Sequence, residues 1–184
     1  MSFKWWIAIA VVLFGLGIAL GLVTPTGGGM SGAVGQELSA LQELSAMLAP
    51  FTVSTALIIL LKNVSALVFS FVFSPFLLLV PVLALLVNGW LLSLVGVAVV
   101  QQKSLLFLAA GILPHGIFEL PALFIGEAAA LSTGALIIGA LLSPERREGL
   151  KPGLKRNLRY LVIAAILMVP AAVMETFVTP LFIK

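Results

Sequence analysis

Residues 104–142 read SLLFLAAGILPHGIFELPALFIGEAAALSTGALIIGALL, and this stretch decides how often the chain crosses a membrane. The run is mostly apolar and about twice as long as the roughly 20 residues that one helical crossing needs. Its first half contains Pro114, Gly116 and Pro121, which disfavour a regular helix. Irregular backbone at membrane depth is tolerated where protein or water surrounds it. We therefore expect a broken or re-entrant segment near 114–121 joined to one full crossing, with two full crossings as the alternative.

The composition places the whole chain in a membrane. Of its 184 residues, 61% are hydrophobic and only 9% are charged, whereas soluble domains carry about 25% charged residues. The chain has no cysteine, which excludes disulfides and thiolate metal sites. Its net charge of +3 comes from one local basic segment, so nucleic acid is not an expected partner. The length predicts one transmembrane domain over 1–184.

Four further apolar stretches are long enough to cross a bilayer as helices. They cover residues 5–23, 51–73, 76–100 and 157–180. Together with 104–142 they predict an all-α bundle of about five transmembrane helices, or six in the alternative. In the first stretch, Gly17 and Gly21 form a small-xxx-small pair, which is typical of closely packed membrane helices.

Two polar segments give the expected orientation. Residues 143–160 hold six of the ten basic residues, and the positive-inside rule places such a loop in the cytoplasm. Five crossings put Lys4 on that side, whereas six put Lys103 there. Residues 24–50 are then extracytoplasmic, and the leucine spacing within them predicts a short amphipathic helix at 36–49.

Six polar residues interrupt the apolar stretches. They are Lys62, Asn63, Asn88, His115, Glu119 and Glu175. An ionised residue at the centre of a membrane helix costs about 2.5 to 3.5 kcal/mol on insertion scales, so these side chains are expected to form one buried polar cluster. His115 and Glu119 are four residues apart and therefore share a helical face.

The polar cluster has structural and chemical interpretations. Asn88 could join helices by hydrogen bonding, and Lys62 could pair with Glu119 or Glu175. His115, Glu119 and Glu175 are the candidate ligands if a metal is bound, but we expect no metal, no cofactor and no catalytic residue. Glu127 lies in a stretch of small residues and is given less weight.

The order of these polar residues along the chain resembles the pattern of the stage II sporulation protein M family. The matching pieces are Lys62-Asn63, Asn88-Gly89, LPHGIFELPA at 113–122 and METFVTP at 174–180, so the resemblance runs from about residue 55 to the end. It implies a multi-pass protein of the prokaryotic cytoplasmic membrane. The family's namesake acts in engulfment during sporulation as a membrane scaffold for peptidoglycan-degrading partners.

Three functions follow from these observations. A membrane scaffold is favoured by the resemblance, with membrane lipids as partners, and with other envelope proteins and a second copy of the chain left open. A transporter or ion- or proton-coupled protein is the alternative, because broken helices beside intramembrane carboxylates recur in transporters. An intramembrane hydrolase is the third, since His115 and the two glutamates could hold a metal or activate water.

Overall fold

The computed structural model describes residues 1–24, 49–76 and 78–182, and it contains five helices long and apolar enough to span a membrane. They are α1 (Phe3–Val23), α3 (Val53–Phe73), α4 (Leu79–Gln102), α5 (Leu105–Leu142), and the continuous run Leu150–Phe182. The last run comprises α6 (Leu150–Val173), the π-helical turn η2 (Met174–Val178) and α7 (Thr179–Phe182). The all-α bundle of five crossings is confirmed. The predicted amphipathic helix at 36–49 lies outside the described residues, apart from its last residue.

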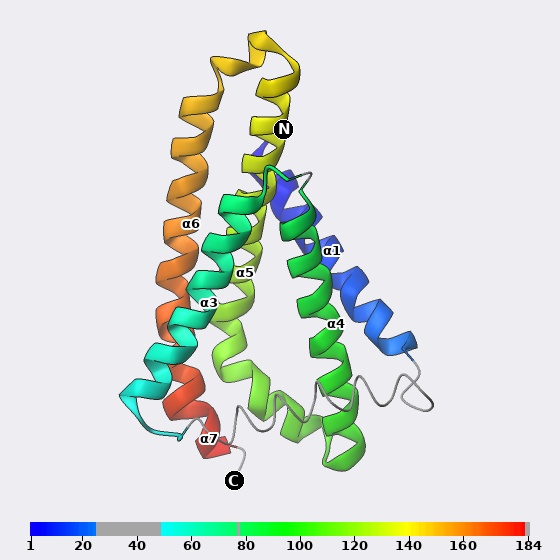
Figure 1. The fold of residues 1–184 in the computed structure, drawn as a ribbon. Coiled ribbons are helices and arrows are strands. Elements are labelled where there is room, and N and C mark those ends of the chain that lie inside the picture. The colour runs from blue at the N-terminus through cyan, green and yellow to red at the C-terminus, as the bar shows by residue number, and fades with distance from the viewer. Residues whose placement is uncertain (25–48, 77, 183–184) are drawn as a thin grey trace.

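Helix α5 forms the centre of the bundle (Figure 1). In its most apolar window 56% of the residues are buried, against 11% in α3. Small residues explain this position, because Ala128, Ala129 and Ala130 are fully buried at 0% exposure and let neighbouring helices approach closely. Two apolar cores flank α5, one around Leu85 and Leu131 and the other around Leu67 and Leu161.

The predicted break at 114–121 is wrong as an interruption of the helix. Helix α5 continues through Pro114, Gly116 and Pro121 over 38 residues. Figure 1 shows that the first half of α5 bends away from the direction of the second half, toward the foot of α4. Proline removes a hydrogen bond from the helix and crowds the preceding turn, but packed neighbours can support a kinked helix at membrane depth. The prolines and the glycine in this stretch therefore indicate a bend in α5 and not a break.

The N-terminus and the α5–α6 connection share one end of the bundle, which we call the basic end (Figure 1). The 3₁₀ turn η1 (Pro144–Arg147) makes that connection, and Phe3 of α1 stacks on Tyr160 of α6 with ring centroids 3.6 Å apart. Lys4 thus lies at the same end as the basic segment, as five crossings require. Lys103, at the end of α4, lies at the opposite end.

Helices α1 and α4 pack through glycines. A Cβ at Gly17 would overlap the Leu86 carbonyl of α4, and one at Gly21 would lie 2.8 Å from the Trp90 carbonyl. In return, a Cβ at Gly89 of α4 would overlap the Phe14 carbonyl of α1. The predicted Gly17–Gly21 pair is therefore a real contact surface, and Gly89 is its counterpart.

Helices α3 and α4 are joined at the basic end and diverge from it (Figure 1). Leu78, which precedes α4, has φ of 61°, a left-handed conformation that is costly for a branched side chain. Its N–H donates to the Ser74 carbonyl at 3.2 Å. Gly134 of α5 packs against this turn so closely that a Cβ would overlap both Ser74 and Leu78. The turn is thereby fixed against α5, whereas the far ends of the two helices separate.

Candidate functional site

His115 joins the bent half of α5 to the C-terminal helix α7. Its Nδ1 lies 3.2 Å from the Thr179 hydroxyl oxygen, and its Nε2 lies 3.7 Å from Glu119 Oε2 one turn along α5. The predicted contact between His115 and Glu119 is therefore present. Thr179, which the sequence analysis did not identify, is a second partner of the imidazole. Both ring nitrogens thus have a polar neighbour, which fixes the plane of the ring.

Glu175 reaches this region from the π-helical turn η2. Its carboxylate is close enough to Glu119 and Lys62 for their charges to act on it. A π-turn inserts an extra residue into a helix, changes the side-chain register and often marks a functional site. The turn also presents the Thr176 carbonyl, which accepts a hydrogen bond from the Phe51 N–H at 3.2 Å. We call His115, Glu119, Glu175 and Thr179 the His115 cluster.

The side chains of Lys62 and Asn88 are less buried than the sequence predicts. Lys62 and Asn88 are exposed, so the expectation of one buried cluster is wrong for these two side chains. Asn63, His115, Glu119 and Glu175 are half-buried. The Asn88 amide donates to the Ala84 carbonyl of its own helix at 2.7 Å, which contrasts with the proposed bond between helices. Asn88 nevertheless lines a cavity of about 120 Å³ together with His115 and Glu119.

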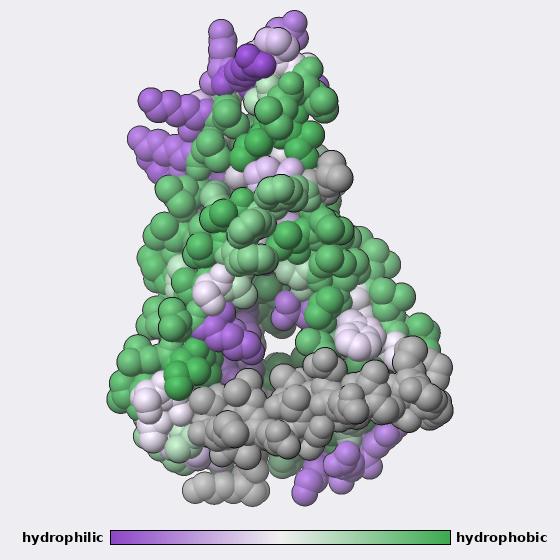
Figure 2. All heavy atoms as spheres, viewed as in Figure 1, coloured by the Kyte–Doolittle hydropathy of each residue, from purple (hydrophilic) through white to green (hydrophobic). Residues whose placement is uncertain are grey.

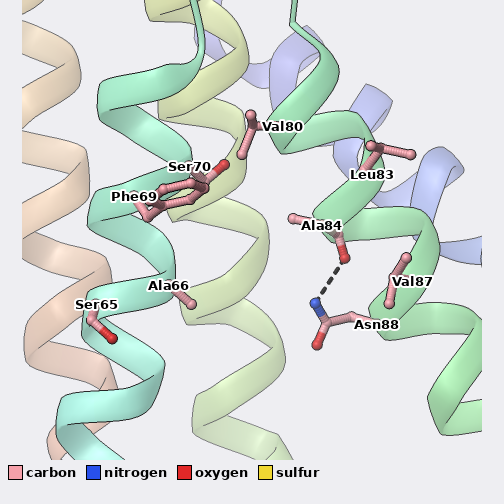
Figure 3. A pocket seen from close by; sticks show the side chains of 9 residues that line it. All are labelled: Ser65, Ala66, Phe69, Ser70, Val80, Leu83, Ala84, Val87 and Asn88. Atoms are coloured by element: carbon pink, nitrogen blue, oxygen red, sulfur yellow. Dashed lines mark hydrogen bonds between the residues drawn. The ribbon is translucent and has the colours of Figure 1, made fainter.

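A groove between α3 and α4 adjoins the His115 cluster. It has a volume of about 700 Å³, and Asn88 lies on the wall of both the groove and the smaller cavity. Figure 3 shows Ser65, Ala66 and Phe69 on the α3 wall facing α4, with α5 behind. In Figure 2 the surface is hollowed between these helices, and hydrophilic side chains lie on both sides of the hollow. The groove is thus an apolar trough with a few hydrogen-bonding groups.

The candidate metal ligands are not assembled as a set. Within the described residues, no group of three or more His, Cys, Asp or Glu side chains is placed to hold a metal ion. His115, Glu119 and Glu175 instead form one pair and one neighbouring carboxylate. Hydrogen bonding and charge are therefore the chemistry that this arrangement offers.

The most deeply buried polar side chains were missed or given little weight. Glu127 is 1% exposed and accepts a hydrogen bond of 2.5 Å from the Ser70 hydroxyl of α3. Asn157 of α6 is fully buried, and its amide lies 3.0 Å from both the Ser132 and the Thr133 hydroxyl oxygens of α5. An unbroken run of buried residues around Glu127 connects these contacts along α5. These bonds hold α3 and α6 to the central helix.

Comparison with known proteins adds a family to this geometry. A family model described as Stage II sporulation protein M matches residues 7–180. The chain belongs to the stage II sporulation protein M family. The match begins within α1, farther toward the N-terminus than the resemblance from residue 55, so it includes all or most of every described spanning helix of this stage II sporulation protein M family member.

One curated relative extends the comparison of this family member. The chain is 32% identical over 97 residues to an uncharacterized protein of Methanocaldococcus jannaschii. The matched region covers 52% of this chain and 54% of that protein, so the chain spans about half the length of the relative. No solved structure matches the chain. The chain is thus a multi-pass membrane protein of the stage II sporulation protein M family.

Proposed function

We propose that the chain is a membrane scaffold that holds a transmembrane helix of a partner protein in the groove between α3 and α4. The observation that carries this proposal is the groove itself, about 700 Å³ between two helices that meet only at the basic end. Membrane helices associate by close packing and by hydrogen bonds between polar side chains. A groove that offers both is suited to a helix of another chain.

The groove selects the chemistry of its occupant. Asn88 uses its amide nitrogen in the bond to Ala84, and its carbonyl oxygen has no hydrogen-bond partner among the described residues. An unpaired amide oxygen in hydrocarbon is costly. A partner helix with a hydroxyl or amide donor facing Asn88, and apolar side chains facing Leu83 and Val87, would satisfy this oxygen and fill the trough.

The His115 cluster supports the same function from behind the groove. It ties the bent half of α5 to α7 through Thr179. The bent half of α5 is therefore held to α7 by a contact that does not involve the residues lining the groove. No transport or hydrolysis step is needed to explain these contacts.

The proposal includes an orientation. The basic end, with Lys4 and the segment 143–160, faces the cytoplasm of a prokaryotic cell, and the membrane is the cytoplasmic membrane. The wide part of the groove and the His115 cluster then lie toward the extracytoplasmic side. A partner that works outside the membrane, such as an envelope enzyme with one membrane anchor, would be held where it acts.

Site-specific photocrosslinking in cells tests the groove. A photoreactive residue at Val87, on the groove wall, is expected to capture one envelope protein through a peptide of its transmembrane helix, identified by mass spectrometry. The matched control is Ile166, an apolar residue of α6 that is 62% exposed and does not line the groove. Substituting Ala66→Phe, which fills the groove from the α3 side, is expected to abolish the crosslink at Val87.

Four results would overturn the scaffold proposal. A crosslink only to a second copy of this chain would make the groove a dimer contact. A crosslink only to lipid would make it a lipid-facing recess. Equal capture of the same protein at Ile166, or capture that survives Ala66→Phe, would show that the groove does not select the partner.

A further inference from the structure

A second cavity lies at the basic end, away from the groove. It has a volume of about 410 Å³, between the start of α1, the end of α5 and the start of α6. Its lining includes Trp6, Ser132, Gly139, Glu145, Arg146 and Arg156. Three segments that are distant in sequence thus contribute to one site, and nothing in the scaffold proposal uses it.

The charge of this cavity is unbalanced. Two arginines, Arg146 and Arg156, line it against a single acidic residue, Glu145. Among the described residues, neither Arg146 nor Arg156 forms an ion pair with a carboxylate. Arginine is the side chain best suited to bind two oxygens of a phosphate at once. The cavity therefore favours an anion with several oxygens.

Glycine makes room for one of the arginines. A Cβ at Gly139 would lie 3.4 Å from Nη1 and Cδ of Arg146, so the Arg146 side chain lies directly across the helix at this point. A larger side chain at position 139 would occupy space between Arg146 and α5. The cavity thus depends on the absence of a side chain there as well as on the two charges.

The buried side of the cavity adds a hydrogen-bond donor. Ser132 lines it although the residue is only 1% exposed, and the Ser132 oxygen accepts from the Asn157 amide at 3.0 Å. Because the oxygen is the acceptor in that bond, the hydroxyl proton is left to donate elsewhere. Asn157 Oδ1 is buried without a hydrogen-bond partner among the described residues. The Ser132 hydroxyl and Asn157 Oδ1, on the buried side of the cavity, can thus each form one more hydrogen bond.

We propose that this cavity binds the phosphate of an anionic ligand, with Arg146 and Arg156 on the phosphate oxygens and Ser132 as a further donor. A lipid headgroup and a free phosphate ester share this chemistry. Trp6 on the wall marks the depth of the membrane interface, where tryptophan concentrates and lipid phosphates lie. The inference stands independently of the partner helix in the groove.

Native mass spectrometry of the full chain in neutral detergent tests the site. Phosphatidylglycerol is expected to remain bound, and phosphatidylcholine with the same acyl chains is expected to bind at least about tenfold more weakly. Arg146→Gln combined with Arg156→Gln is expected to weaken phosphatidylglycerol binding by about tenfold or more. Gly139→Leu keeps every charge and is expected to weaken binding by filling the cavity.

The matched control is Lys151→Gln with Arg159→Gln. It removes the same charge from the same basic segment, but neither residue lines the cavity, so binding is expected to be retained. Competition by inorganic phosphate distinguishes the two sources: displacement of the lipid indicates a site for free phosphate groups, and no displacement indicates a lipid headgroup site.

Two outcomes would overturn the phosphate site. Equal loss of binding in the two double variants would show diffuse attraction to a basic surface. Equal retention of phosphatidylglycerol and phosphatidylcholine by the unsubstituted chain would show that the cavity does not select an anionic ligand. The melting temperature of each variant without lipid identifies unfolded protein, and the arginine pair, which lies at the exposed basic end, remains decisive if Gly139→Leu does not fold.

Discussion

At the scale of single residues, Glu127 is held in the centre of the bundle by one hydroxyl. Its contact with Ser70 spans 57 positions of sequence at 2.5 Å, and both residues are 1% exposed. In a bundle whose helices meet mainly through apolar atoms, a hydrogen bond between α3 and α5 also fixes their register. Ser70 lines the groove as well, so this bond joins the α3 wall of the groove to α5.

The first prediction is that the Ser70–Glu127 bond stabilises the fold. Ser70→Ala is expected to lower the free energy of unfolding in detergent by about 1 to 3 kcal/mol, because the buried carboxyl loses its donor. Glu127→Gln is expected to cost less, since an amide oxygen still accepts the bond. Ser65→Ala is the control on the same helix, because Ser65 is exposed and donates to the Lys62 carbonyl.

A double-mutant cycle separates this bond from other effects. Ser70→Ala should cost little in a Glu127→Leu background, since the hydroxyl then has no carboxylate to lose. Additive costs for the two substitutions would show that they do not stabilise the fold through each other.

At the scale of elements, glycine decides how α1 meets α4. The carbonyl oxygens of Phe14 and Leu86 occupy the positions that side chains at Gly89 and Gly17 would need. Backbone atoms in a helix cannot move aside as a flexible side chain can. The pairing of these two helices therefore tolerates no added methyl group.

The second prediction follows from that contact. Gly89→Ala is expected to lower the free energy of unfolding by about 1 to 3 kcal/mol through overpacking against Phe14. Gly15→Ala, on the same helix as Gly17 but with nothing within 4 Å of its added Cβ, is the control and is expected to be neutral or stabilising. A melting temperature of Gly89→Ala equal to that of Gly15→Ala would contradict the close approach.

Elements also show where prediction from the sequence succeeds and where it stops. Apolar run length predicts the five crossings, and the four-residue spacing of His115 and Glu119 predicts their contact. Hydroxyl partners could not be predicted, because Ser and Thr are common in membrane helices and most often bond their own helix, as Ser65 and Ser74 do. Nothing in the sequence distinguishes Ser70 or Thr179 from these. The prolines signal a departure from straight helix, but they do not decide between a bend and a break.

At the scale of the whole molecule, five crossings place the two ends of the chain on opposite sides of the membrane. Lys4 lies with the basic segment, and Lys103 lies at the far end. The orientation itself comes from the charge distribution, because the segment 143–160 holds six of the ten basic residues.

The third prediction is that the basic end faces the cytoplasm. Because the chain has no cysteine, single substitutions Gly149→Cys and Gln102→Cys give clean labelling sites, and both positions are exposed. A membrane-impermeant thiol reagent applied to intact cells is expected to label Gln102→Cys and to label Gly149→Cys only after permeabilisation. Labelling of both from outside would contradict five crossings, and the reversed pattern would contradict the orientation.

The turn between α3 and α4 has a mechanical consequence. Leu78, in its left-handed conformation against Gly134, closes the α3–α4 pair at one end. A rotation of α4 about this point, the pivot, would move its far end in proportion to the length of the helix. A helix of 24 residues is about 36 Å long at 1.5 Å per residue, so a rotation of about 5° at the pivot displaces the tip by about 3 Å. That displacement is comparable to the size of a methyl group. A small rotation of α4 beside Ser74 would thus change the distance between the far ends of α3 and α4 by several times more than it moves the turn itself.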